Sequence, residues 1–262
     1  MLSTKIGKIN QLLATFLPFI CLTGIVVLQG QEYKRSVQKL DRANYLLQEQ
    51  KEAKSIAFAN RSPNLGFSNL KADLSYLNFV QYFGDKEARE TIGYKLVPDY
   101  FEAIAQIDPR FTGAHLRLSI ANSMYAGDAE TTIALMQQVL DSIEPISEEA
   151  VAVWTSKGLD ELLFMGDKEA AIESYKMAEQ WAALVKGDRS EKLEIKDLEE
   201  ALKSTNELEL KEAQLRAWSS VLIHIRDHQR KKEIIDRIDR IKDEILVLQQ
   251  SEISNEYPKG IR

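Results

Sequence analysis

The sequence predicts an all-α protein, with one N-terminal transmembrane helix followed by a solenoid of helical hairpins and a C-terminal helical cap. Two observations lead to this fold class. No charged residue lies between Lys8 and Glu32, although 28% of the chain is charged. A Gly-Asp turn followed by helix-forming residues recurs at Gly84, Gly127 and Gly166, and recurrence at a nearly fixed period is typical of repeat architectures.

The charge-free run covers residues 9–31 and follows a short N-terminal flank, 1–8. Its 23 residues are enough for a helix to cross the ~30 Å apolar core of a bilayer. A cleaved signal peptide is the alternative, because Lys5 and Lys8 precede the run. The run is longer than a typical signal-peptide core, and LQGQEYKR after it lacks the small residues of a cleavage site. We therefore expect an uncleaved anchor that contacts membrane lipid.

Basic residues on the two sides of the run predict the orientation of this anchor. Three positive charges precede it, on Lys5, Lys8 and the amino terminus, and four follow it, on Lys34, Arg35, Lys39 and Arg42. The positive-inside rule then places the body on the cytoplasmic side. Residues 32–62 are polar and favour a juxtamembrane helix or linker, which ends at the Pro-containing and Gly-containing break SPNLG.

Residues 63–185 are expected to form three helical hairpins. Each repeated glycine stands between two stretches with helical spacing of apolar residues, so each marks the turn of a hairpin. Pro109 and Pro145, 36 residues apart, are placed to end the second helix of a hairpin. The first copy is longer, and Gly93 and Pro98 interrupt its second helix.

The third copy resembles a tetratricopeptide repeat, whose period is about 34 residues. The positions that carry this resemblance are Trp154, Gly158, Gly166, Ala171, Tyr175 and Ala178, with one residue more between the two glycines than the family has. The second copy departs from the pattern at Ser119, Thr132 and Met136. The resemblance implies stacked hairpins with a concave surface for protein partners.

Residues 186–262 hold 16 basic and 17 acidic residues and are expected to form a charged helical cap. An amphipathic helix is predicted over about 206–228. The last helix carries apolar residues at steps of four and three, namely Ile234, Ile238, Ile241, Ile245 and Leu248. This spacing favours packing on the preceding helix, and pairing between two copies of the chain is the alternative.

The composition and motifs exclude several function classes. A net charge of −6 disfavours binding to nucleic acid, which needs a basic face. The single cysteine, Cys21, allows neither an internal disulfide nor a cysteine zinc site. His224 and His228 lie four residues apart without further ligands nearby, and His115 accompanies no nucleophile motif. We therefore predict no catalytic, cofactor or metal site and no small-molecule substrate, and we keep an enzyme as the rival class.

The remaining function is a non-catalytic protein interaction scaffold. Polar residues of the predicted first helices are the candidate partner-binding residues: Asn78, Arg117, Asn122 and Lys157. The segment 32–185 has 16 basic and 23 acidic residues, a net charge of −7, so a basic segment of a client protein is favoured electrostatically.

A second resemblance rests on the pattern LNFVQYFGD, then GYKLVPDYFEAIAQIDPRF, then YAGD. Behind an N-terminal span, this pattern resembles membrane-anchored tetratricopeptide proteins of cyanobacteria and plastids, some of which assist photosystem assembly. The resemblance implies a thylakoid or cytoplasmic-membrane protein whose body is cytoplasmic or stromal and which assists the assembly of a membrane complex. The alternative is a permanent accessory subunit of such a complex.

Overall fold

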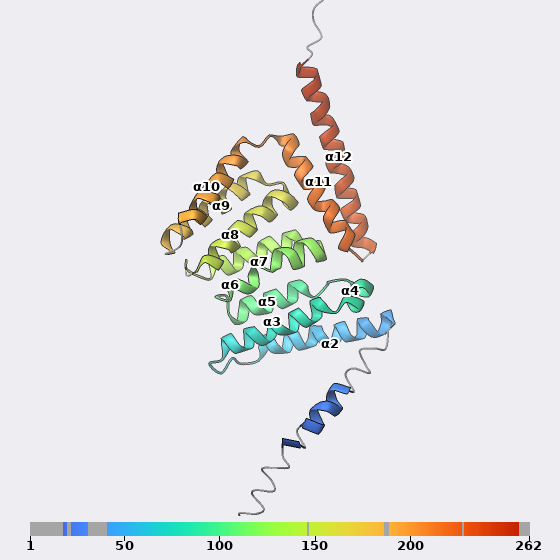
Figure 1. The fold of residues 1–262 in the computed structure, drawn as a ribbon. Helices are drawn as coiled ribbons and strands as arrows, with labels where there is room; N and C mark the ends of the chain where they lie inside the picture. The colour runs from blue at the N-terminus through green and yellow to red at the C-terminus, as the bar shows by residue number, and fades with distance from the viewer. Residues whose placement is uncertain are drawn as a thin grey trace, which may run out of the picture. The chain divides into compact units, whose positions relative to one another are not determined.

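We describe the protein from a computed structural model. The structure describes residues 18–19, 22–30, 41–145, 147–185, 189–226 and 228–256. Every regular element in these ranges is a helix, which confirms the all-α prediction (Figure 1). The chain divides into two units, Met1–Asn44 and Tyr45–Arg262.

The transmembrane helix predicted over 9–31 is wrong, because no helix in the described ranges is both long enough and apolar enough to cross a membrane. The described residues of this range, 18–19 and 22–30, are helical and exposed. The predicted localisation as a single-pass membrane protein is wrong for the same reason. The flank 1–8 and the other residues of the predicted span, 9–17, 20–21 and 31, lie outside the described residues.

Residues 32–62 were expected to form a juxtamembrane helix or linker. Helix α2 (Arg42–Arg61) lies in this range, and it packs on the helices that follow. Ile56 is buried in the same core as Phe79. The amide of Asn60 donates a hydrogen bond to Gln106 at 2.5 Å. Residues 32–40 of the predicted linker lie outside the described residues.

Three helical hairpins follow α2. The first is made of α3 (Ser68–Gly84), α4 (Lys86–Ile92) and α5 (Val97–Ile107). The second contains α6 (Thr112–His115), the π-helix η1 (Ser119–Ala126) and α7 (Ala129–Asp141). The third contains α8 (Glu148–Asp160), the π-helix η2 (Glu161–Met165) and α9 (Lys168–Leu184). Within the second unit the hairpins lie one above another, as Figure 1 shows.

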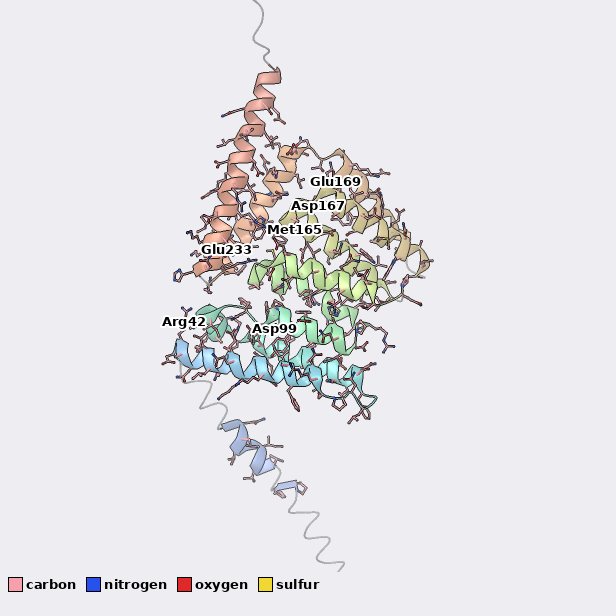
Figure 2. All side chains as sticks on the ribbon, turned by 180° about the vertical axis from the view of Figure 1, so that it is seen from behind. Arg42, Asp99, Met165, Asp167, Glu169 and Glu233 are labelled. Atoms are coloured by element: carbon pink, nitrogen blue, oxygen red, sulfur yellow. The ribbon has the colours of Figure 1, made fainter. Side chains whose placement is uncertain are left out.

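The recurring Gly-Asp pair forms the same turn in the second and third hairpins. Gly127 and Gly166 adopt left-handed backbone angles, with φ of 73° and 72°, which glycine reaches without steric cost. The next residue is aspartate, and the side chains of Asp128 and Asp167 accept hydrogen bonds from the backbone N–H three residues on, at 3.2 and 2.8 Å. The glycine therefore ends one helix and the aspartate caps the next. Figure 2 labels Met165, Asp167 and Glu169 at the turn of the third hairpin.

The extra length of the first hairpin lies where the sequence predicted it. Helix α4 ends at Gly93, which has a φ of 80°, and α5 begins at Val97, with Pro98 in its first turn. The second helix of this hairpin is therefore divided in two. The segment between α4 and α5 stands beside η1 and beside residues 224–226.

The small residues of the third copy allow two helices to approach closely. A Cβ atom on Gly158 would lie 2.8 Å from the ring of Tyr175, which is closer than van der Waals contact permits. Trp154 and Trp181 pack edge to face in the same core, with ring centroids 5.8 Å apart. Gly158 is therefore required by the packing of α8 on α9.

The C-terminal region forms three helices, α10 (Arg189–Ser204), α11 (Glu207–His224) and α12 (His228–Glu256). Asn206 caps α11 in a reciprocal capping box with Glu209. The isoleucines Ile234, Ile238, Ile241 and Ile245 are buried with Trp218 and Val221 of α11. The apolar face of α12 thus packs on the preceding helix, as predicted, and this cluster also contains Phe164 of the third hairpin.

Candidate functional site

The four candidate residues chosen from the sequence do not form one groove. Asn78 is exposed on α3 and Arg117 is exposed just before η1. Asn122 on η1 and Lys157 on α8 are buried. Asn78 and Arg117 can therefore be reached by a partner protein, and Asn78 also lines a surface pocket.

Lys157 is held inside the protein by two polar neighbours. Its Nζ lies 2.5 Å from Oε1 of Glu161 and donates to Oγ of Ser174 at 3.0 Å. The hydroxyl of Ser174 donates to the other oxygen of Glu161 at 2.6 Å. Because all three side chains are buried, this ion pair joins α8 and η2 to α9 and does not face a partner.

Asn78 lines a polar pocket of about 300 Å³ between α2, α3 and α4. Figure 1 shows these three helices at one end of the second unit. Its charged lining consists of three carboxylates, on Glu49, Glu52 and Asp85, and one guanidinium, on Arg89. We call it the acidic pocket.

Hydrogen bonds and one ion pair fix the side chains of the acidic pocket. Arg89 lies 3.5 Å from Oε1 of Glu49, and its guanidinium lies 3.7 Å from the centre of the Tyr82 ring. The hydroxyl of Tyr82 donates to Glu49 at 3.1 Å, and that of Tyr100 donates to Glu52. Burial raises the pKa of both tyrosines above the ordinary value of 10.0, so these hydroxyls stay protonated and remain donors at neutral pH.

A face of exposed leucines on α3 leads to the acidic pocket. Leu70, Leu74 and Leu77 are 56%, 53% and 54% exposed, and steps of four and three place them on one side of the helix. Gln81, four residues further, continues the same side and lines the acidic pocket. We call Leu70, Leu74 and Leu77 the leucine face.

The opposite side of α3 is also apolar, and it packs into the body. The ring of Phe79 lies 4.7 Å from Phe101 and 5.6 Å from Phe83, centroid to centroid. Tyr82 is buried as well. Core packing therefore accounts for the aromatic residues of α3 and leaves the leucine face without a partner among the described residues.

Sequence reasoning missed the leucine face and the carboxylates of α2. A helix with apolar residues on both sides is the available signal for the leucine face, because an ordinary surface helix is apolar on one side only. Glu49 and Glu52 stand in a segment that looked like a polar linker, and nothing local in the sequence pairs them with Tyr82, Arg89 or Tyr100.

The histidines do not form a metal site in the described part of the chain, where no group of three or more His, Cys, Asp or Glu is placed to hold an ion. The ring of His224 stacks on Tyr125, with centroids 4.2 Å apart. His115 is fully buried, and burial lowers its pKa to about 4. A histidine in this state is neutral at pH 7 and closed to solvent.

No family model matches the chain, and no curated protein and no solved structure matches it. The tetratricopeptide resemblance therefore stays a prediction from the motifs of the sequence.

Proposed function

We propose that the protein is a non-catalytic interaction scaffold that binds a basic, amphipathic helix of a partner protein at the leucine face and the acidic pocket. The observation that carries this proposal is the exposed leucine face that leads to three carboxylates, two on α2 and one, Asp85, at the start of α4. An amphipathic helix that docks on an apolar surface is a common mode of peptide recognition.

The leucine face offers binding free energy to such a helix. Each leucine is about half exposed, so covering it removes about half of a leucine side chain from water and contributes roughly 1 kcal/mol. Three leucines then contribute on the order of 3 kcal/mol. A helix with apolar residues at steps of three and four matches the spacing of Leu70, Leu74 and Leu77.

The acidic pocket supplies charge selectivity. Three carboxylates face one arginine there, so a lysine or arginine at the end of the partner helix is attracted and an acidic residue is repelled. Complementary charge of this kind affects the association rate and the choice of partner more than the final affinity.

Site-specific photo-crosslinking from Leu77 in the native host tests this proposal, with a crosslinker at Leu246 of α12, which is 55% exposed, as the matched control. We expect crosslinks specific to Leu77 that map to a helix with a basic end and apolar residues at helical spacing. A synthetic peptide of that helix is then expected to bind Leu74→Asp at least about ten-fold more weakly than the unmodified protein, and Leu246→Asp equally well. Equal crosslinking from both positions, or crosslinks to acidic segments, would contradict the proposal.

The same surface serves a transient assembly factor or a permanent accessory subunit. The stoichiometry of the protein in the purified complex of its partner separates the two, since only a subunit is present in every copy. The role in photosystem assembly stays a prediction of the family resemblance, and the identity of the crosslinked protein tests it.

A further inference from the structure

A second pocket lies away from the leucine face. Its volume is about 400 Å³, and its walls come from the segment between α4 and α5, from η1, and from the turn between α11 and α12. This volume lies within the range of small-molecule sites. We call it the aromatic pocket, and the residues that carry the argument are Tyr94, Lys95, Asn122, Tyr125, His224 and Arg226.

Three rings stand in a row on the wall of the aromatic pocket. Tyr125 on η1 lies 5.3 Å from Tyr94 and 4.2 Å from His224, centroid to centroid. The Tyr125 and His224 planes are tilted by 32°. All three side chains are half-buried, so the row can accept a further flat ring from a ligand, which aromatic side chains bind by stacking.

The charged residues of the aromatic pocket are mainly basic, although the protein is acidic as a whole. Lys95, Arg226 and Arg230 line it together with one carboxylate, Asp128. Arg230 lies 3.9 Å from Asp128 and donates to the carbonyl of Gly127, so this carboxylate has a basic neighbour already.

Lys95 and Arg226 supply the surplus positive charge, and within the described residues neither forms a salt bridge. Arg226 donates to the backbone carbonyls of Ile223 and Ile225 at 2.8 and 3.4 Å, which holds its side chain at the end of α11. Two carboxylates interact with this wall, Glu90 with Tyr94 and Asp99 with Lys95, and neither lines the aromatic pocket. An anionic group is therefore favoured there.

Asn122 supplies a hydrogen-bond acceptor. Its Nδ2 donates to the carbonyl of Asp128 at 2.8 Å and to Oγ1 of Thr132 at 3.2 Å. Because a carbonyl can only accept, these bonds fix which end of the amide is nitrogen. The other end, Oδ1, is buried and accepts no hydrogen bond from the described residues. A buried acceptor without a donor is costly, and a ligand N–H group would satisfy it.

We propose that the aromatic pocket binds a small molecule that joins a flat heteroaromatic ring to an anionic group, as a purine nucleoside monophosphate does. The ring stacks on the row of Tyr94, Tyr125 and His224, and the phosphate pairs with Lys95 and Arg226. An amino group on the ring donates to Oδ1 of Asn122. This ligand class departs from the sequence-based expectation of no small-molecule ligand, and it is independent of helix binding at the leucine face.

Asn122 and Tyr125 come to the same pocket from one helix. Both stand on the π-helix η1 (Ser119–Ala126), three residues apart, a spacing that places two side chains next to each other on the surface of a helix. Segments of this kind are frequent at functional sites. The left-handed Gly127 ends η1 directly beside the pocket.

Isothermal titration calorimetry of the full chain tests the ligand class, with AMP, GMP, adenosine, inorganic phosphate and purine riboside 5′-monophosphate, which lacks the amino group, as probes. We expect AMP or GMP to bind with a Kd below about 1 mM. Adenosine and inorganic phosphate, which each lack one half of the ligand, are expected to bind at least about ten-fold more weakly. Purine riboside 5′-monophosphate is also expected to bind at least about ten-fold more weakly, because it has no amino group to donate to Oδ1 of Asn122. Absence of binding by both nucleotides, or equal binding by adenosine or by phosphate alone, would overturn the proposal.

Substitutions in the aromatic pocket test whether the nucleotide binds there. The double change Lys95→Gln and Arg226→Gln removes two exposed charges and leaves the buried core intact, and it is expected to weaken nucleotide binding at least about ten-fold. Tyr125→Ala is expected to do the same, whereas Tyr125→Phe keeps the ring and the affinity. Arg117→Gln removes an exposed charge elsewhere and is the matched control. Binding that is unchanged in the double variant, with circular dichroism showing a folded chain, would place the ligand elsewhere and refute the site.

Discussion

Two buried ionisable groups are expected to give the stability of this protein opposite dependences on pH. Asp160, at the end of α8, is 1% exposed, and the hydroxyls of Ser119 and Ser123 donate to its two oxygens at 2.7 Å each. Burial raises its pKa from 3.8 to about 6. His115 is fully buried, and burial lowers its pKa from 6.5 to about 4.

The direction of each pH dependence follows from which protonation form of the group the folded state prefers. The folded state prefers the protonated carboxyl of Asp160, so this group contributes stability below pH 3.8 and loses it as the pH rises through about 6. The folded state prefers the neutral imidazole of His115, so this group contributes stability above pH 6.5 and loses it as the pH falls towards 4. At about 1.4 kcal/mol for each tenfold change in proton affinity, each effect is on the order of 3 kcal/mol. In the unmodified protein the two effects largely cancel between pH 4 and 7.

Single substitutions separate the pH effect of Asp160 from that of His115. Of these two groups, only His115 remains in Asp160→Asn, so the free energy of unfolding is expected to rise by roughly 3 kcal/mol between pH 4 and 7 relative to a variant with neither group. In His115→Leu, which keeps an apolar side chain of similar volume, it is expected to fall by a similar amount. The double variant serves as the reference, since the other titrating groups are common to all three chains.

Urea unfolding followed by tryptophan fluorescence at pH 4, 5, 6 and 7 measures these free energies. The reasoning is refuted if both single variants show the same slope with pH as the double variant. A slope opposite to the expected one in either variant would also contradict the reasoning. It would show that folding stabilises the charged form of the group that the variant retains, which is His115 in Asp160→Asn and Asp160 in His115→Leu.

Three further substitutions test the packing, and urea unfolding at pH 7 measures each. Gly158→Ala places a Cβ atom 2.8 Å from the Tyr175 ring and is expected to cost about 1–3 kcal/mol of stability; an unchanged stability would mean that α8 and α9 separate without cost. Arg89→Leu leaves Glu49 buried without its cation and is expected to cost about 3–5 kcal/mol, much of which is regained on adding Glu49→Gln; additive losses would show that the two side chains do not interact. Asn206→Ala removes the capping box of α11 and is expected to cost about 1 kcal/mol, whereas no loss would indicate that the first turn of α11 is held by other contacts.

The hairpin turns could be predicted from the sequence because their physics is local. A glycine that tolerates a left-handed backbone and an aspartate that caps the next helix act within a few residues, so Gly127-Asp128 and Gly166-Asp167 mark the turns without knowledge of the fold. The seam of isoleucines on α12 was predicted for a similar reason, since helical spacing alone defines one face.

The candidate site could not be predicted in the same way. Burial of Lys157 depends on Ser174, which another helix brings within 3.0 Å, although Glu161 four residues on was a visible partner. Exposure of Leu70, Leu74 and Leu77 depends on which side of α3 meets α5, and helical spacing does not choose between two apolar sides. The prediction for 9–31 was wrong, since no helix in the described part of the chain is long and apolar enough to cross a membrane, and a charge-free run in a sequence does not by itself establish one.

The two π-helices give the repeats a way to absorb a change in length. The third copy has one residue more between Gly158 and Gly166 than the tetratricopeptide pattern, and η2 (Glu161–Met165) lies in that interval. A π turn takes up one residue more than an α turn, so the helix before and the turn after keep their rotational positions. Deletion of Leu162 should therefore convert η2 to a regular α turn and be tolerated, whereas deletion of Thr155 would rotate the rest of α8 by about 100° and turn Gly158 away from Tyr175. Insertions and deletions within the first helices of the second and third hairpins are thus expected in the π turns before Gly127-Asp128 and Gly166-Asp167.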